Sequence, residues 1–480
     1  MRSLQVAWFL SAAFLLAGGL ATADVFEWTG AGAGDSWDDS DNWNLISGTS
    51  GRLYPNSTSD TATVTAFGAD LTIDVSTSFS VGGLTAGNAS HKLTFGGTGG
   101  LVTNGADWNT EGVVQFDVDV DMGNFKDLYG TSDGMTIVGA GNTFTSSRQP
   151  RLRHPFRIFG AFNSNADVVQ VRDRLEVATD GDMSNGPLNL HGGGQWEIAA
   201  YGADRSVNVG INRVGNRSGK FDGTNGYDLA FVGSNTLGAI GAITDGTTSL
   251  EVDTSKLTLG GTLTLNENDG FHLHPVRVTN GGTLELTAQS TTAGIDLVVD
   301  GNGTLLLNNG EGSATGTGNT LVVGRQNWVG TSSVTLGGTG STDSALVVGP
   351  GGTVAPGQSI GDLGVGTATF EEGATLSVEV NSDDGTSDTL VIGGDLDLSN
   401  NDTLVLSDLG TPSGGTHTIA TYTGTLHGAF DDLVAGNTVF TIDDVDYATP
   451  GTIRLRIPEP STVLLLTLGA TLGFVARRRR

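Results

Sequence analysis

The 480-residue sequence contains no cysteine. Disulfides, thiolate metal ligands and cysteine nucleophiles are therefore excluded, and the fold must be stabilised by packing and backbone hydrogen bonds. Basic residues are also scarce, 23 against 52 acidic ones, and five of them (Arg2 and Arg477–Arg480) lie at the two ends of the chain. Since phosphate binding needs a surface of the opposite sign, nucleic acid is not an expected partner.

Proline is rare, at 11 residues, whereas glycine reaches 75. This balance favours many tight turns between short strands. Recognisable catalytic or metal-binding motifs are few. His272 and His274 lie two apart on a candidate strand and could share a metal ion, but no third ligand is close in the sequence. We therefore expect no catalytic residue, no metal site and no cofactor.

Residues 1–23 have the form of a secretory signal peptide. Arg2 supplies the positive start, Leu4–Leu20 the apolar core, and Ala21 and Ala23 the small residues of a cleavage site. An uncleaved N-terminal anchor is the alternative, but the polar start at Asp24 favours cleavage. The sequence predicts export.

Residues 24–140 are expected to form a strand-rich cap and the first turns of a solenoid. Trp28, Trp37 and Trp43 fall within 16 residues. They are interpreted as covering an open end of the fold rather than stacking on sugars. The neighbouring carboxylates could bind Ca²⁺, although their spacing is more typical of solvated turns: Asp35, Asp38, Asp39 and Asp41.

The clearest strand pattern is Val114–Asp121. Apolar and acidic residues alternate there, which predicts a half-buried strand. Its three outer carboxylates are Asp117, Asp119 and Asp121. They are interpreted as a solvated face that discourages edge pairing, with a cation site or an acid–base array as the alternatives.

Residues 141–245 are less regular, and we interpret them as a variant solenoid section or an insertion. Arginines concentrate in this section, at positions 148, 151, 153, 157, 172, 174, 205, 213 and 217. One hypothesis is a surface for anionic polysaccharide or an acidic neighbour, since planar guanidinium suits carboxylates. The other, which we favour, is pairing with Asp and Glu within the chain.

Residues 246–456 show a drifting repeat. Strand-like segments begin at Thr262, Thr283 and Thr304, 21 residues apart, and again at Thr353, Thr375 and Asp395, 22 and 20 apart. A period near 21 predicts an all-β fold, a right-handed parallel β-helix (β-solenoid), with one turn per repeat. Leucine-rich repeats and antiparallel sandwiches fit this pattern less well.

One segment is distinctive within this repeat, Gly351–Leu363. It resembles the autotransporter-associated β-strand repeat, in which the characteristic positions correspond here to Gly352, Pro356, Gly357, Ser359, Gly361 and Leu363. The resemblance implies a passenger-type β-helix that acts as a scaffold. No outer-membrane barrel follows in this sequence.

Residues 457–480 consist of Pro458-Glu459-Pro460, an uncharged apolar run (Thr462–Ala476) and four arginines, Arg477, Arg478, Arg479 and Arg480. As a helix the run would reach ~22 Å, so we expect a short transmembrane helix with its arginines in the cytoplasm. This tail resembles the PEP-CTERM sorting signal of Gram-negative bacteria. The resemblance implies transient anchoring in the inner membrane, cleavage by an exosortase-type protease, and release to the cell surface or matrix.

Together these features predict an exported, non-catalytic structural protein of the cell surface or exopolysaccharide matrix. The alternative is a polysaccharide-binding or polysaccharide-degrading β-helix protein. A degrading enzyme would need a clustered Asp/Glu or Arg/Lys site on one face of the solenoid, and the candidate clusters are Asp117–Asp121 and the arginines at positions 148–157.

Overall fold

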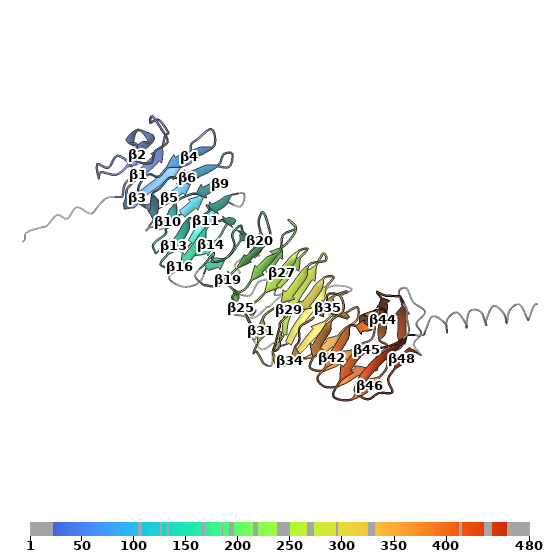
Figure 1. The fold of residues 1–480 in the computed structure, drawn as a ribbon. Coiled ribbons are helices and arrows are strands. Elements are labelled where there is room, and N and C mark those ends of the chain that lie inside the picture. The colour runs from blue at the N-terminus through green and yellow to red at the C-terminus, as the bar shows by residue number, and fades with distance from the viewer. Residues whose placement is uncertain are drawn as a thin grey trace, which may run out of the picture.

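The structure, a computed structural model, describes residues 23–457 except 104–107, 125–126, 132–133, 149, 165–168, 185, 192–195, 215–218, 238–249, 266–272, 294–295, 325–331, 412–414 and 436–443. These residues form an elongated parallel β-solenoid of the right-handed type, with β1 (Val25–Trp28) and β48 (Val445–Asp446) at opposite ends (Figure 1). The expected solenoid is thus confirmed.

The two targeting segments fall largely outside this part. Ala21 and Pro458–Arg480, with the expected transmembrane helix, lie outside the described residues, and Ala23 is exposed coil. Within the described residues, no helix is long and apolar enough to span a bilayer.

From β9 onward the chain visits three faces in a fixed order on each turn. The first face is one 16-stranded parallel sheet. Its strands are β4 (Leu71–Asp74), β6 (Leu93–Gly96), β9 (Val113–Phe116), β12 (Met135–Val138), β15 (Phe156–Ile158), β18 (Arg174–Val177), β20 (Trp196–Ala200), β23 (Gly219–Asp222), β26 (Leu250–Asp253), β29 (Leu273–Thr279), β32 (Asp296–Gly301), β34 (Thr317–Val323), β36 (Asp343–Val348), β39 (Ala368–Phe370), β43 (Leu396–Leu398) and β46 (Leu426–Gly428).

The second face has two sheet segments, joined by single bridges around residues 181–184. Its strands are β7 (Gly100–Thr103), β10 (Asp119–Asp121), β13 (Thr143–Ser146), β16 (Ala161–Ser164), β21 (Arg205–Val207), β24 (Leu229–Phe231), β27 (Lys256–Leu259), β30 (Thr283–Leu286), β33 (Thr304–Leu307), β35 (Thr335–Gly338), β37 (Thr353–Pro356), β40 (Thr375–Asn381), β44 (Thr403–Asp408) and β47 (Asp432–Ala435); the short β41 (Thr386–Ser387) folds back on β40.

The third face carries β8 (Trp108–Thr110), β11 (Asp127–Gly130), β14 (Arg151–Leu152), β17 (Val169–Val171), β19 (Leu188–His191), β22 (Ile211–Val214), β25 (Ser234–Leu237), β28 (Thr262–Leu265), β31 (Gln289–Ser290), β38 (Asp362–Val365), β42 (Thr389–Ile392) and β45 (Gly415–Tyr422). Strands on either side of residue 141 and of residue 245 pair in register, so the arginine-containing section is part of the same stack.

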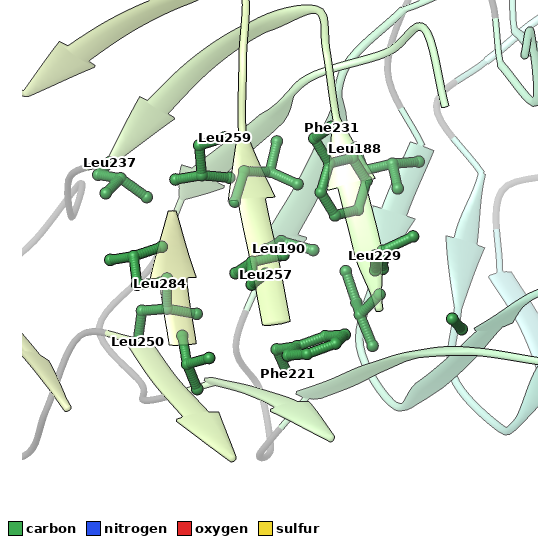
Figure 2. Packing of buried hydrophobic residues seen from close by; sticks show 14 of the residues in the cluster. Leu188, Leu190, Phe221, Leu229, Phe231, Leu237, Leu250, Leu257, Leu259 and Leu284 are labelled. Carbon is green, nitrogen blue, oxygen red and sulfur yellow. The ribbon is translucent and has the colours of Figure 1, made fainter. Parts of the chain in front are cut away.

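The core is a continuous apolar column inside the three faces. In β30, for example, Leu284 and Leu286 are buried whereas Thr283 and Glu285 point outward. Figure 2 shows Leu190, Phe221 and Leu257, one from each face, directed into the same interior. A single turn could not bury its apolar side alone, so stacking supplies the core.

The repeat interval was predicted correctly in part. Thr283 pairs with Thr304 and Thr353 with Thr375, so these intervals are single turns. The intervals starting at Thr262 and at Thr375 are wrong as turns, because Thr262 lies on the third face and pairs with Gln289, and Thr375 pairs with Thr403 and not with Asp395. Paired positions on the second face are separated by 283 − 256 = 27, 335 − 304 = 31 and 353 − 335 = 18 residues. Turn length therefore varies with the loops.

Additional strands pair with each end of the stack. At the N-terminal end β1 (Val25–Trp28) pairs antiparallel with β2 (Trp43–Ser47), which follows the 3-10 helix η1 (Ser40–Asn42), and β3 (Ser57–Val64) and β5 (Phe79–Ala86) continue the sheet. At the other end β49 (Thr452–Ile457) pairs antiparallel with β45 and with β48 (Val445–Asp446). Strand β49 ends at the residue before Pro458, which has no backbone N–H to continue a ladder.

Candidate functional site

The three N-terminal tryptophans are part of the core. Trp28, Trp37 and Trp43 are 2%, 0% and 7% exposed, and the Trp37 and Trp43 ring centroids lie 4.8 Å apart. The Trp43 indole N–H donates to the Trp37 carbonyl at 2.7 Å. This arrangement agrees with the capping interpretation, and it leaves no tryptophan face of this cluster open for a sugar ring.

The acidic residues between these tryptophans organise turns. Asp39 accepts a hydrogen bond from the Asp41 N–H at 3.0 Å, and Asp38 accepts one from the Ser36 hydroxyl at 2.6 Å. In the described part of the chain, no three His, Asp or Glu side chains are grouped so that they could hold a metal ion. His272 lies outside that part, as does the side chain of His274.

The carboxylate row Asp117–Asp121 faces outward, while Val114, Phe116, Val118 and Val120 are buried as predicted. Asp119 accepts from the Thr143 N–H at 2.8 Å and Asp121 from the Gly123 N–H at 2.8 Å. Asp119 and Asp121 lie on β10 of the second face, and Asp117 lies just before it. Strand β14 and its arginines lie on the third face. The carboxylate row and the arginines of β14 therefore lie on different faces.

The outer side of the first face carries a ladder of charges with alternating sign. Successive turns place these side chains opposite one another in register: Arg174, Glu197, Lys220, Glu251, Arg277 and Asp300. Opposite charges at neighbouring positions of a sheet stabilise that pairing, and like charges oppose it. The ladder therefore favours one stacking register.

Arg174 is the most connected cation of this ladder. Its guanidinium lies 2.6 Å from Glu197, 2.7 Å from Asp222 and 3.0 Å from Glu176. Burial opposes the charge, but the hydrogen bonds to the three carboxylates outweigh burial and raise the pKa of Arg174. Lys220 is similarly held by Asp253 at 2.5 Å. Arg174 and Lys220 thus serve to pair strands of neighbouring turns.

Other arginines are also paired within the chain, as the favoured hypothesis predicted. Arg157 lies 2.6 Å from Glu176, and Arg205 lies 3.1 Å from Asp180. On the third face Arg151 and Arg153 share one carboxylate, that of Asp127. The side chains of Arg213 and Arg217 lie outside the described residues.

The segment Gly352–Leu363 forms β37, a tight turn and β38. Gly357 has φ +85°, and an added Cβ there would lie 1.9 Å from the Ser359 carbonyl oxygen, so only glycine fits. Leu363 and Pro356 are buried, and Ser359 is exposed. The Gly361 N–H donates at 2.9 Å to the buried Asp388, which also accepts from Glu379 N–H at 2.7 Å.

This turn also contains the pattern Gly-x-Ser-x-Gly, which the sequence interpretation missed. In hydrolases the pattern places a nucleophilic serine between a strand and a helix. Here Gly357–Gly361 connects two strands, β37 and β38, and no helix follows. A hollow of about 230 Å³ beside it is lined by Ser359, Glu379 and Asp388, with no histidine. The turn thus lacks the geometry of a nucleophile elbow.

Comparison with known proteins identifies the tail. A family model of the PEP-CTERM protein-sorting motif matches residues 456–480, so it begins within the last two residues of β49. No curated protein matches the chain. The motif is a signal for export, sorting and exosortase-type processing. Fold and motif together define the class as an exported, envelope-sorted β-solenoid protein.

Proposed function

We propose that the protein is a non-catalytic structural rod of the cell surface or exopolysaccharide matrix. The observation that carries this proposal is the sorting motif, which starts within β49, the strand that pairs antiparallel with β45 at the C-terminal end of the solenoid. The added antiparallel strands at each end pair with part of the stack, which limits edge-to-edge association there and suits an exposed scaffold. The surplus of carboxylates adds solubility.

The sorting route follows the resemblance of the tail. An exosortase-type protease would recognise Pro458–Glu459–Pro460 while the apolar run holds the chain in the inner membrane of a Gram-negative bacterium. The signal peptide, cleaved after Ala23, would start this route. The turn at Gly352–Leu363 would be an autotransporter-associated repeat, and such repeats act as scaffolds.

Deleting Pro458–Arg480 tests the sorting proposal. The truncated protein should still fold, because the deletion begins after the last strand. We expect it to leave the surface fraction and accumulate in the periplasm or medium, as followed by fractionation and immunoblotting. A matched variant, Glu459→Gln, examines the motif alone. Unchanged surface exposure of the truncated protein would contradict sorting by the tail.

A polysaccharide-degrading activity is the second candidate function. Incubating the purified protein with acidic and neutral polysaccharides should release no new reducing or unsaturated ends. Turnover that Asp119→Ala or Arg153→Ala abolishes would refute the structural proposal.

A further inference from the structure

On the third face, Arg151 and Arg153 share the carboxylate of Asp127, and Arg172 lies on the next turn. Arg151 Nη1 lies 3.2 Å from each oxygen of Asp127, and Arg153 Nε lies 2.5 Å from Asp127 Oδ1. Arg172 donates from Nε and Nη2 to Gln170 Oε1, at 3.2 and 3.0 Å. Among the described residues, no further carboxylate pairs with these guanidinium groups. The group is locally cationic in a chain of net charge −29.

The cations form a line along the axis of the solenoid. Leu128, Leu152 and Val171 occupy one register on β11, β14 and β17 and are each 0% exposed. The residue that follows each of them therefore points outward: Tyr129 on β11, Arg153 just after β14 and Arg172 just after β17. The backbone hydrogen bonds between neighbouring turns continue at these residues. The Arg153 N–H donates to the Leu128 carbonyl at 3.0 Å, and the Arg172 N–H donates to the Leu152 carbonyl at 2.9 Å. Neighbouring strands are ~4.8 Å apart, so the line presents one side chain per step.

An aromatic ring ends this line. Tyr129 is 47% exposed, and the Arg153 guanidinium carbon lies 5.3 Å from its ring centroid. A half-exposed ring offers an apolar face with a polar tip, which suits the apolar face of a sugar. The adjacent guanidinium groups offer forked donors that match carboxylates. Burial and the charges of Arg153 and Arg151 lower the pKa of Arg172, so a bound anion would relieve this repulsion.

We propose that Tyr129, Arg151, Arg153 and Arg172 form a binding site for one strand of a carboxylate-bearing polysaccharide that runs along the solenoid axis. A thin polymer can contact this group without approaching the acidic second face, where Asp119 and Asp121 are exposed. A broad anionic surface, such as a membrane or a nucleic acid duplex, would meet those carboxylates as well and be repelled. The inference deepens the proposed matrix function by naming the partner's chemistry.

The test titrates the purified full chain with polygalacturonate, and with dextran, dextran sulfate and phosphatidylglycerol vesicles as comparison probes. We expect binding to polygalacturonate that weakens at high salt, and none to dextran. The double variant Arg153→Gln/Arg172→Gln should bind about tenfold or more weakly. Tyr129→Ala should also weaken binding, whereas Asp127→Asn, which removes the neutralising carboxylate, should strengthen it.

Arg205→Gln/Lys256→Gln is the matched control, since it removes the same two positive charges from paired positions elsewhere in the solenoid and should leave binding unchanged. An equal loss in this control would mean that only overall charge matters and would refute the site. Tighter binding to vesicles or to dextran sulfate than to polygalacturonate would refute the proposed partner. If the double variant misfolds, the site is still tested by Tyr129→Ala, which should weaken binding to polygalacturonate, and by Asp127→Asn, which should strengthen it. If the unmodified protein does not bind polygalacturonate but is still sorted to the surface, this inference is refuted and the proposed structural function is not.

Discussion

Individual buried carboxyl groups near the C-terminal end make the fold sensitive to pH. Asp402 is 0% exposed, and neither of its carboxylate oxygens has a hydrogen-bond partner of normal geometry among the described residues. Burial, together with repulsion from Asp431 and Asp397, raises its pKa to about 7. Burial likewise raises the pKa of Asp388 to about 6. Burial thus keeps both groups protonated to a higher pH than an exposed aspartate.

The direction of the resulting pH dependence follows from linkage. The folded state binds the Asp402 proton more tightly than the unfolded state between the ordinary pKa of 3.8 and about 7. The free energy of unfolding therefore falls as pH rises through that window. We expect Asp402→Asn to flatten this slope and to raise the melting temperature at pH 8 relative to the unmodified protein, but not at pH 4. Thermal melts monitored by circular dichroism across this range provide the measurement.

Glu372→Ala, at an exposed position of the same region, is a suitable comparison and should leave the slope unchanged. A slope in Asp402→Asn that equals that of the unmodified protein would show that Asp402 does not titrate as described.

At the scale of elements, the charge ladder links strands β18, β20 and β23. Glu197 lies between Arg174 and Lys220 in register, and it contacts Arg174 at 2.6 Å. Glu197→Lys would place three cations on successive turns. We expect a destabilisation of about 1 kcal/mol that shrinks at high salt, because screening weakens repulsion between exposed charges. Urea unfolding at low and high salt measures it.

Glu27→Lys is the matched variant, since Glu27 points outward on β1 opposite the uncharged Asn44 and Thr63. It makes the same charge change without a neighbouring cation in register. Equal effects of the two substitutions, or an effect of Glu197→Lys that does not depend on salt, would contradict the ladder.

At the scale of the whole molecule, each turn contacts mainly the turns beside it, so damage at one end should stay local. Trp37 is fully buried in the N-terminal cap and packs against Trp43, Phe79 and Phe95. Trp37→Ala should lower the free energy of unfolding of the N-terminal cap by about 3–5 kcal/mol. We expect faster hydrogen exchange in β1–β6, with β40–β49 still protected, as measured by mass spectrometry.

Trp37→Phe keeps most of the apolar volume and should show a much smaller effect. Uniform loss of protection along the chain in Trp37→Ala would mean that the solenoid unfolds as a single cooperative unit, contrary to the nearest-neighbour expectation.

The sequence by itself determined the local features of this protein. Alternation in Val114–Asp121 predicted which side of the strand is buried, because side chains in a strand point to opposite faces. The three N-terminal tryptophans predicted a covered end. The tail predicted the sorting motif, because its three elements are contiguous in the sequence.

Only the tertiary structure decided which distant residues meet. Thr262 and Thr283 carry the same pattern, yet they lie on different faces, because variable loops set where each strand enters the stack. The same loops bring Arg174 to Asp222, 48 residues away, and align Arg153 with Arg172 beside Tyr129. Parallel stacking aligns residues that are separated by a whole turn, and the length of that turn is not encoded in the period-two pattern of any one strand.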